Sequence, residues 1–216
     1  MPKLLGHILA PAAPAPVIEA ERTASPRFTA GDAALPSASF DAFYRDTWRF
    51  VWRSLGRLGA PQWAMEDLFQ EVFLVVHRRL PDYEPPSENA DLAARVWVFR
   101  ILRFVLRSHR RGSHRKGAPF HSDAIDLDAV PGATETPHVI AERSERVQLL
   151  YDLLDTLDSE KREIFVLVEL EGLTARDAAS ALALNERTAR TRLNAARADF
   201  KKAFERHRAR DEWRLK

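Results

Sequence analysis

Residues 169–197, ELEGLTARDAASALALNERTARTRLNAAR, predict two short helices joined by a tight turn. Gly172 can end the helix before them, because glycine readily takes the left-handed conformation that closes helices. Thr174 and Asn185 each stand where a side-chain oxygen can accept hydrogen bonds from the free N–H groups at the start of a helix. The turn between the two helices is then Ala183-Leu184-Asn185.

The second of these helices has one apolar and one polar face. The apolar residues recur at three- and four-residue steps and predict the side that faces a core: Ala189, Leu193, Ala196, Phe200 and Ala203. The opposite side carries Arg187, Arg190, Thr191, Asn194 and Lys201. An apolar-backed helix that presents Arg, Thr and Asn after a tight turn is typical of a helix-turn-helix reader of DNA. An ordinary helical hairpin with a solvated charged face is the alternative.

Composition and charge narrow the class of protein. The chain has 216 residues, 45% of them hydrophobic and 30% charged, which suits one or two domains with buried cores. The formal net charge is only +2, but the basic residues cluster. Residues 95–116 hold eight Lys or Arg and no acidic residue, and residues 186–216 hold eleven basic against five acidic residues. Two separate basic segments predict two contacts with a polyanion.

Several kinds of site and location are not expected. The absence of cysteine excludes disulfides and thiolate metal sites. No apolar run is long enough to span a bilayer, and residues 4–10 make a poor secretory signal, so we expect a cytoplasmic protein without membrane insertion. Glu66, Asp67 and Glu71 cluster on one helix, but His77 is six residues from Glu71, whereas a di-metal bundle site needs three. No catalytic motif, metal site or cofactor loop is found, and an enzyme is not expected.

The N-terminal half predicts three helices, and the third carries a stripe of arginines. The helices span residues 39–58, 63–80 and 91–111. The stripe and the aromatic residues at its margin are Arg100, Arg103, Arg107 and Arg110, with Trp97 and Phe104. Like charges at this spacing repel one another, so the stripe destabilises the helix unless a counter-charge arrives. Phosphates would supply it, and the rings suit stacking on unpaired bases. A solvated face without a partner is the alternative.

The sequence therefore predicts an all-α protein, with two small helical domains joined by a flexible linker. The expected boundaries are a disordered Ala/Pro-rich tail at 1–38, a first domain at 39–111, a linker at 112–137, a second domain at 138–208 and a C-terminal tail at 209–216. Within the second domain, helices are expected over residues 139–154 and 159–171 before the helix-turn-helix. Asp158 or Ser159 would cap the 159–171 helix, with Glu163 completing the capping arrangement.

Four of these segments resemble, in order, the motifs of the ECF (extracytoplasmic function) sigma factors, which direct bacterial RNA polymerase to promoters. FDAFYRDTWRFVWRSLGRLG (40–59) is similar to the first conserved helix of that family, and EDLFQEVFLVVHRRL (66–80) to the helix that docks on the polymerase clamp. WVFRILRFVLRSHRR (97–111) is similar to the promoter-melting helix, and residues 157–197 to the terminal helix-turn-helix domain. The likeness covers about residues 40–204.

The resemblance implies core RNA polymerase and promoter DNA as partners, and an anti-sigma protein as well, since many relatives have one. The residues implied to contact the polymerase are Asp67, Gln70 and Glu71, although acidic residues also favour a helix N-terminus for electrostatic reasons. Those implied to meet the minus-ten element are Tyr83 in a base-capturing loop, Arg100, Arg103, Phe104, Arg107 and Ser108. Those implied to meet the minus-thirty-five element are Arg187, Arg190, Thr191 and Asn194 in the major groove, with Arg176 and Arg197 on phosphates.

Three positions depart from the family pattern. Phe104 and Ser108 stand where Asn and Asp are common in the family, which leaves the minus-ten sequence open. Ala183 stands where Gly is usual, which predicts a slightly altered turn.

Two other functions remain as alternatives. A stand-alone helix-turn-helix regulator would leave the 66–80 motif unexplained, and a helical interaction scaffold would tolerate loss of Arg190 or Asn194.

Overall fold

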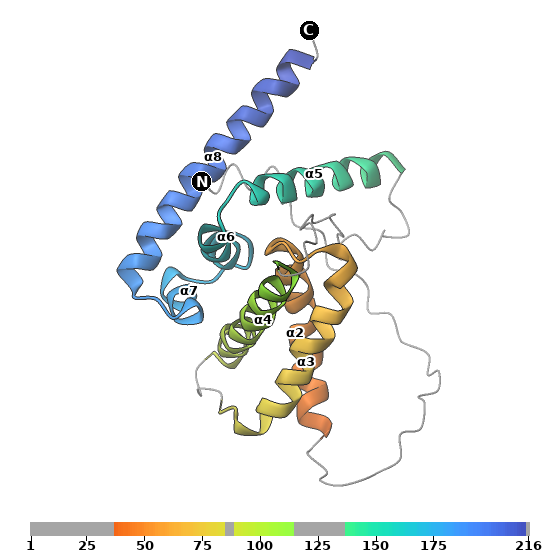
Figure 1. The fold of residues 1–216 in the computed structure, drawn as a ribbon, viewed down its shortest axis with the longest axis vertical. Coiled ribbons are helices and arrows are strands. Elements are labelled where there is room, and N and C mark those ends of the chain that lie inside the picture. The colour runs from red at the N-terminus through yellow and green to blue at the C-terminus, as the bar shows by residue number, and fades with distance from the viewer. Residues whose placement is uncertain (1–36, 85–88, 115–136, 215–216) are drawn as a thin grey trace.

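The computed structural model describes residues 37–84, 89–114 and 137–214, and every regular element within these ranges is a helix (Figure 1). The N-terminal elements are α2 (Ser37–Arg57), η1 (Gln62–Ala64), α3 (Met65–Arg79), η2 (Leu80–Asp82) and α4 (Ala90–His114). The C-terminal elements are α5 (Pro137–Asp155), α6 (Ser159–Phe165), the π-helical η3 (Val166–Leu170), α7 (Ala175–Leu182) and α8 (Glu186–Arg214). The predicted all-α class is confirmed.

Helices α2, α3 and α4 pack against one another around an apolar core. The apolar stripes of the three helices supply it: Val51, Leu55, Leu68, Val72, Val76, Val98, Leu102 and Val105. Burying one such side chain contributes about 1.5–3 kcal/mol. Gly59, with a φ of 80°, turns the chain after α2, and the Ala60 N–H donates to the Leu55 carbonyl at 3.0 Å. This left-handed closure fixes where α2 stops.

Helices α6, α7 and α8 form a second packed unit, with α5 against α8. Phe165 of α6 stacks on Phe200 of α8 with their ring centroids 4.5 Å apart. Leu182 of α7 and Leu193 of α8 are buried in the same core. The apolar back of α8 therefore anchors it to the rest of the unit along its N-terminal half, as its periodicity predicts.

The sequence places the caps of α6, α7 and α8 correctly. Each capping side chain accepts a hydrogen bond from the backbone N–H three residues later: Asp158 at 2.9 Å, Thr174 at 3.2 Å and Asn185 at 2.8 Å. Between α7 and α8, Ala183 has φ 55° and ψ 44°, which is the left-handed conformation. The turn thus requires the backbone geometry that suits glycine, at a position that holds alanine.

Three helices extend past the domain boundaries expected from the sequence. The C-terminal tail at 209–216 is mostly helix, because α8 continues to Arg214 through residues that contain no Gly or Pro and are rich in Arg, Glu and Ala. Residues 112–114, assigned to the linker, extend α4, and α2 begins at Ser37, inside the predicted tail. The rest of the 1–38 tail, and most of the linker, lie outside the described residues.

The predicted 159–171 helix changes its winding before it ends. Residues 166–170 are π-helical, and the Glu171 N–H donates to the Val166 carbonyl at 3.0 Å. A π-turn inserts one extra residue into the helical repeat and so redirects the side chains that follow it. Glu169 and Glu171 point to different partners, Arg197 of α8 and Arg57 of α2 respectively.

The two units are docked on each other. Figure 1 shows α4 running beside α7, and these two helices are in contact. Gly56 of α2 and Tyr151 of α5 meet closely, since a Cβ atom added at Gly56 would lie 2.8 Å from the Tyr151 hydroxyl oxygen. The arginine face of α4 therefore lies where the second unit can reach it.

Candidate nucleic-acid interface

The N-terminal part of α8 presents an exposed polar face on a fixed back. Arg187, Arg190 and Asn194 are exposed, whereas Ala189 and Leu193 are buried at 0% and 4% exposure. The Arg190 guanidinium pairs with Glu186 at 2.6 Å one turn earlier. The predicted reading face is thus brought together on one side of a single helix.

Thr191, Arg176 and Arg197 differ in their exposure and in their contacts. Thr191 is exposed, and its hydroxyl donates to the Arg187 carbonyl at 3.0 Å. Arg176, on α7, is exposed. Arg197 is only 35% exposed at its side chain, and it forms an ion pair with Glu169 at 2.6 Å. Arg197 therefore ties α8 to η3, a role that its position in the sequence did not reveal.

The arginine stripe of α4 is engaged by the second unit. Arg100 donates to the carbonyl and hydroxyl oxygens of Ser180 at 2.7 and 3.0 Å. Arg103 donates to Glu163 at 2.8 Å and to the Leu182 carbonyl at 3.2 Å. Arg107 also pairs with Glu163, at 3.1 Å. Glu163 thus supplies a counter-charge to Arg103 and Arg107 from within the chain, whereas Arg100 contacts the neutral oxygens of Ser180.

Arg110, the last arginine of the stripe, binds the end of α2. Its guanidinium donates to the Leu58 carbonyl, where the α2 dipole is negative. Burial and the nearby Arg162 guanidinium lower the pKa of Arg110. The stripe therefore divides into three arginines that meet α6 and α7, and one that closes the first unit.

Glu163 was predicted to complete the cap of α6, and this prediction is wrong. Asp158 is the capping residue, so Glu163 lies too far along the helix to reach its N–H groups. Glu163 instead lies one turn before Leu167 on the buried side, with only 4% of its surface exposed. The signal in the sequence was a carboxylate on the apolar face of a helix, which requires a buried partner.

The aromatic residues beside α4 fall into two groups. Phe104 is 64% exposed, and Ser108 is exposed on the same side of the helix. Tyr83, however, stacks on Trp97 with centroids 4.5 Å apart, and Phe43 packs edge-on against both rings. Burial raises the pKa of the Tyr83 hydroxyl. Phe104 is therefore open to a ligand, and Tyr83 is held by its neighbours.

The edge of α3 combines polar groups with one exposed apolar side chain. Asp67, Gln70 and Glu71 are all exposed. Leu74, one turn after Gln70 and Glu71, is 58% exposed on the same side of the helix. An exposed leucine flanked by an amide and a carboxylate suits a protein partner. Sequence analysis did not identify Leu74, because a leucine within an apolar run is usually assigned to a core.

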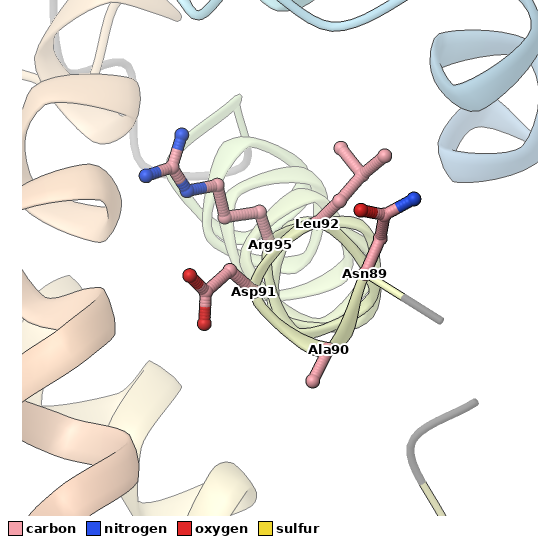
Figure 2. A pocket seen from close by; sticks show the side chains of 5 residues that line it. All are labelled: Asn89, Ala90, Asp91, Leu92 and Arg95. Atoms are coloured by element: carbon pink, nitrogen blue, oxygen red, sulfur yellow. The ribbon is translucent and has the colours of Figure 1, made fainter. Parts of the chain in front are cut away.

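A pocket lies at the start of α4 and is lined by Asn89, Ala90, Asp91, Leu92 and Arg95 (Figure 2). The Asp91 and Arg95 side chains extend to one side of the helix and those of Asn89 and Leu92 to the other. Asn89 has a φ of 57°, which asparagine tolerates better than most residues. Because these side chains diverge, the pocket does not gather polar groups on one point.

Within the described residues, every helix is too short or too polar to span a bilayer. Across the same residues, no three His, Asp or Glu side chains gather as a metal site would require. The notable surfaces of the described chain are thus the α8 face, the α4 face and the α3 edge.

Family models match both units of the chain. Residues 43–116 match Sigma-70 region 2, and residues 147–200 match Sigma-70, region 4. These two segments contain α3 with α4, and α6 with α7 and the N-terminal part of α8, respectively. The three surfaces described above therefore all lie inside the matched segments.

Individual proteins that are similar to the chain are also sigma factors. The chain is 30% identical over 181 residues to the ECF RNA polymerase sigma factor SigE of Mycolicibacterium smegmatis, covering 83% of this chain and 66% of that protein. It is 29% identical over 142 residues to the RNA polymerase sigma factor NccH of Alcaligenes xylosoxydans xylosoxydans, covering 65% of this chain and 73% of that one.

Two solved structures share the fold. The sigma factor RpoE, solved in complex with the anti-sigma factor NepR from Bartonella quintana, superposes with a TM-score of 0.61 at 20% identity, covering 77% of this chain and 96% of that chain. CnrH, solved in complex with the cytosolic domain of CnrY, gives a TM-score of 0.52 at 20% identity, covering 78% and 89%. Two family matches in the expected order, the relatives and the fold together confirm the resemblance seen in the sequence: the chain belongs to the ECF sigma factors, the alternative sigma factors of transcription initiation.

Proposed function

We propose that this protein binds core RNA polymerase through the α3 edge and places two promoter-reading surfaces on DNA. The N-terminal part of α8 reads the minus-thirty-five element, and α4 holds a strand of the minus-ten element as it melts. The observation that carries the proposal is the α8 face, where exposed Arg190 and Asn194 project from a helix whose opposite side is fully packed. A helix held in this way can enter a major groove without losing its position.

Base reading by α8 rests on residue types as well as placement. Asn194 can contact the edge of adenine through two hydrogen bonds, and Arg187 or Arg190 can do so with guanine. The Arg190–Glu186 pair does not block this role, because an exposed ion pair contributes only about 0–1 kcal/mol and can be exchanged. Arg176 is placed on the preceding helix, where it would hold a phosphate and set the register.

Strand holding by α4 rests on Phe104 and the arginines beside it. The exposed Phe104 ring can stack on an unpaired base, which contributes about 1–3 kcal/mol per base. Arg100, Arg103 and Arg107 would neutralise the phosphates of the same strand, with Ser108 nearby. Tyr83 can stack on a flipped base only after it separates from Trp97. We therefore propose that Tyr83 leaves Trp97 on binding and contacts the end of the strand.

Polymerase docking by α3 rests on a mixed edge. Gln70 and Glu71 offer hydrogen-bonding groups, and the exposed Leu74 offers an apolar anchor beside them. Interfaces of this kind have an apolar centre with a polar rim. We propose that the protein acts in the cytoplasm with polymerase, performs no catalysis itself, and is held inactive by an anti-sigma protein. The last point is supported by the structure of RpoE, which was solved with the anti-sigma factor NepR.

The test is reconstitution with purified core RNA polymerase, followed by mapping of the transcription start sites that appear. The expected result is a set of starts preceded by two common elements, present only when both proteins are added. Sequence-specific binding by the isolated chain, without association with polymerase, would instead indicate a stand-alone regulator. If the chain neither associates with polymerase nor binds DNA, the result would indicate a scaffold.

A further inference from the structure

The second unit occupies the face of α4 that the proposed function assigns to promoter DNA. Glu163 of α6 receives hydrogen bonds from Arg103 at 2.8 Å and from Arg107 at 3.2 Å. Ser180 of α7 receives two hydrogen bonds from Arg100. Carboxylate, hydroxyl and carbonyl oxygens thus stand where phosphate oxygens would have to stand.

A second carboxylate of the same unit holds the other side of the interface. Glu171 accepts from Arg57 at 2.6 Å and from Arg53 at 3.4 Å, both on α2. The side chains of Glu163 and Glu171 are only 5% and 2% exposed. Carboxylates this deeply buried are destabilising unless they are paired, so both depend on the arginines of the first unit.

Arg162 of the second unit also reaches across the interface to the end of α2. Arg162 of α6, which is 7% exposed, donates to the Arg57 carbonyl at 2.5 Å and to Asp155. The Arg57 carbonyl lies at the C-terminus of α2, where the helix dipole favours a cation. However, the Nη2 atom of Arg162 is buried without a partner in the structure. An unpaired buried donor opposes docking.

We propose that Glu163 and Glu171 form an interdomain clasp, in which the helix-turn-helix unit competes with the minus-ten strand for the arginines of α4. Each guanidinium can bind the carboxylate or a phosphate, so the clasped chain and the strand-bound chain are mutually exclusive. The strand affinity of the free protein is then the affinity of the open form multiplied by the fraction of molecules in which the clasp is open. The competition rests on the proposed function of α4, whereas the clasp itself does not.

The experiment measures the distance between the units in the full-length chain. Because the protein contains no cysteine, spin labels can be attached at Arg79→Cys on α3 and Lys202→Cys on α8 without other changes. Both positions are exposed. The double variant Glu163→Gln/Glu171→Gln is compared with Glu145→Gln/Glu205→Gln, which removes the same charge from exposed positions. We expect a longer and broader distance distribution for the first variant and no change for the second.

A steric variant tests the same clasp without altering charge. Gly56→Leu would press on the Tyr151 hydroxyl across the interface, whereas a Cβ atom added at Gly112 would have no atom within 4 Å, so Gly112→Leu is the control. Only Gly56→Leu should lengthen the distance, while its helical circular dichroism remains that of the parent chain. An unchanged distance in both Gly56→Leu and the double Gln variant would overturn the clasp.

Binding of a fluorescent single-stranded oligonucleotide then tests the competition. The Glu163→Gln/Glu171→Gln and Gly56→Leu proteins should bind the oligonucleotide about tenfold more tightly than their controls, if the clasp is open in about a tenth of the parent molecules. Longer distances with unchanged strand affinity would overturn the competition and contradict the assignment of α4 to the strand, while leaving the closing role of the carboxylates intact. The distance and the affinity therefore separate failure of the clasp from failure of the proposed function.

Discussion

Arg103 of α4 donates to the Glu163 carboxylate at 2.8 Å, and this contact joins a helix of the first unit to a helix of the second. The carboxylate is nearly inaccessible to solvent, whereas the Arg103 side chain is 19% exposed. An ion pair of this kind is much less screened than one on the surface. One side chain thus couples α4, the helix that we propose holds the minus-ten strand, to the position of α6 in the second unit.

Asn194→Ala should reduce discrimination between the preferred minus-thirty-five element and a version changed at one base pair. The expected loss is about 1–3 kcal/mol, because a two-bond contact to a base edge would disappear. Competition transcription on the two promoters measures it. Lys202→Ala, further along α8, serves as the matched control. Undiminished discrimination by Asn194→Ala would argue against base reading at this position.

Arg176→Ala should weaken promoter binding by the holoenzyme equally on all promoter sequences. A phosphate contact carries no sequence information, and its loss should reduce the slope of log affinity against log salt by about one. Titrations of promoter fragments at several salt concentrations check both points. An effect confined to one base pair would show that Arg176 reads a base instead.

Leu74→Asp should abolish association with core polymerase, and Gln70→Ala/Glu71→Ala should weaken it. The aspartate would bring a charge into the apolar centre of the proposed interface. Co-elution or biolayer interferometry with purified core enzyme gives the affinities. Arg79→Ala, also exposed but on another side of α3, should bind normally. Full association of Leu74→Asp would place the docking surface elsewhere.

Arg107→Glu should impair promoter opening more than closed-complex formation. The substitution breaks the contact with Glu163 and so releases part of the clasp, but it also places a negative charge on the strand path. Permanganate reactivity of unpaired thymines on a promoter fragment reports opening, and a mobility shift at low temperature reports closed binding. Normal melting by this variant would remove Arg107 from the strand path.

Ala183→Gly should stabilise the second unit by about 1 kcal/mol. Alanine in the left-handed conformation costs about 1–2 kcal/mol, and the larger chain entropy of glycine in the unfolded state offsets part of the gain. Urea denaturation followed by circular dichroism measures the change. Ala195→Gly, in the middle of α8, should be destabilising by a similar amount, since glycine is unfavourable inside a helix.

Asp158→Ala should destabilise the protein by about 1 kcal/mol at neutral pH and remove part of its acid sensitivity. Hydrogen bonding from the Lys161 backbone N–H lowers the pKa of Asp158 below its ordinary value of 3.8. The folded state therefore binds this proton less readily than the unfolded state, so the cap stabilises above the ordinary pKa and is lost as pH falls below it. The difference in denaturation midpoint between parent and variant should be smaller at pH 3 than at pH 7.

Local patterns predicted a large part of the fold. The caps at Asp158, Thr174 and Asn185 involve backbone groups only three residues away, so a short stretch of sequence contains both partners. The apolar back of α8 follows from periodicity alone, and so do the exposed positions of Arg190 and Asn194 opposite it. The continuation of α8 to Arg214 was missed, because its last turns have no apolar stripe and are helical through propensity.

The state of the arginine stripe could not be predicted in this way. The sequence indicates that Arg100, Arg103 and Arg107 require counter-charges, but Glu163 lies 60 residues from Arg103 along the chain. Which distant carboxylate approaches depends on how the two units dock, and docking depends on contacts such as that between Gly56 and Tyr151.

By itself, the sequence determined the helices, their caps, the family and the chemical character of each surface, since these depend on neighbours within a few residues. Only the tertiary structure decided which of those surfaces are open. It leaves Phe104, Asn194 and Leu74 accessible, and it pairs Arg103 and Arg107 of α4 with Glu163, because long-range ion pairs form only once packing has fixed the relative positions of the two units.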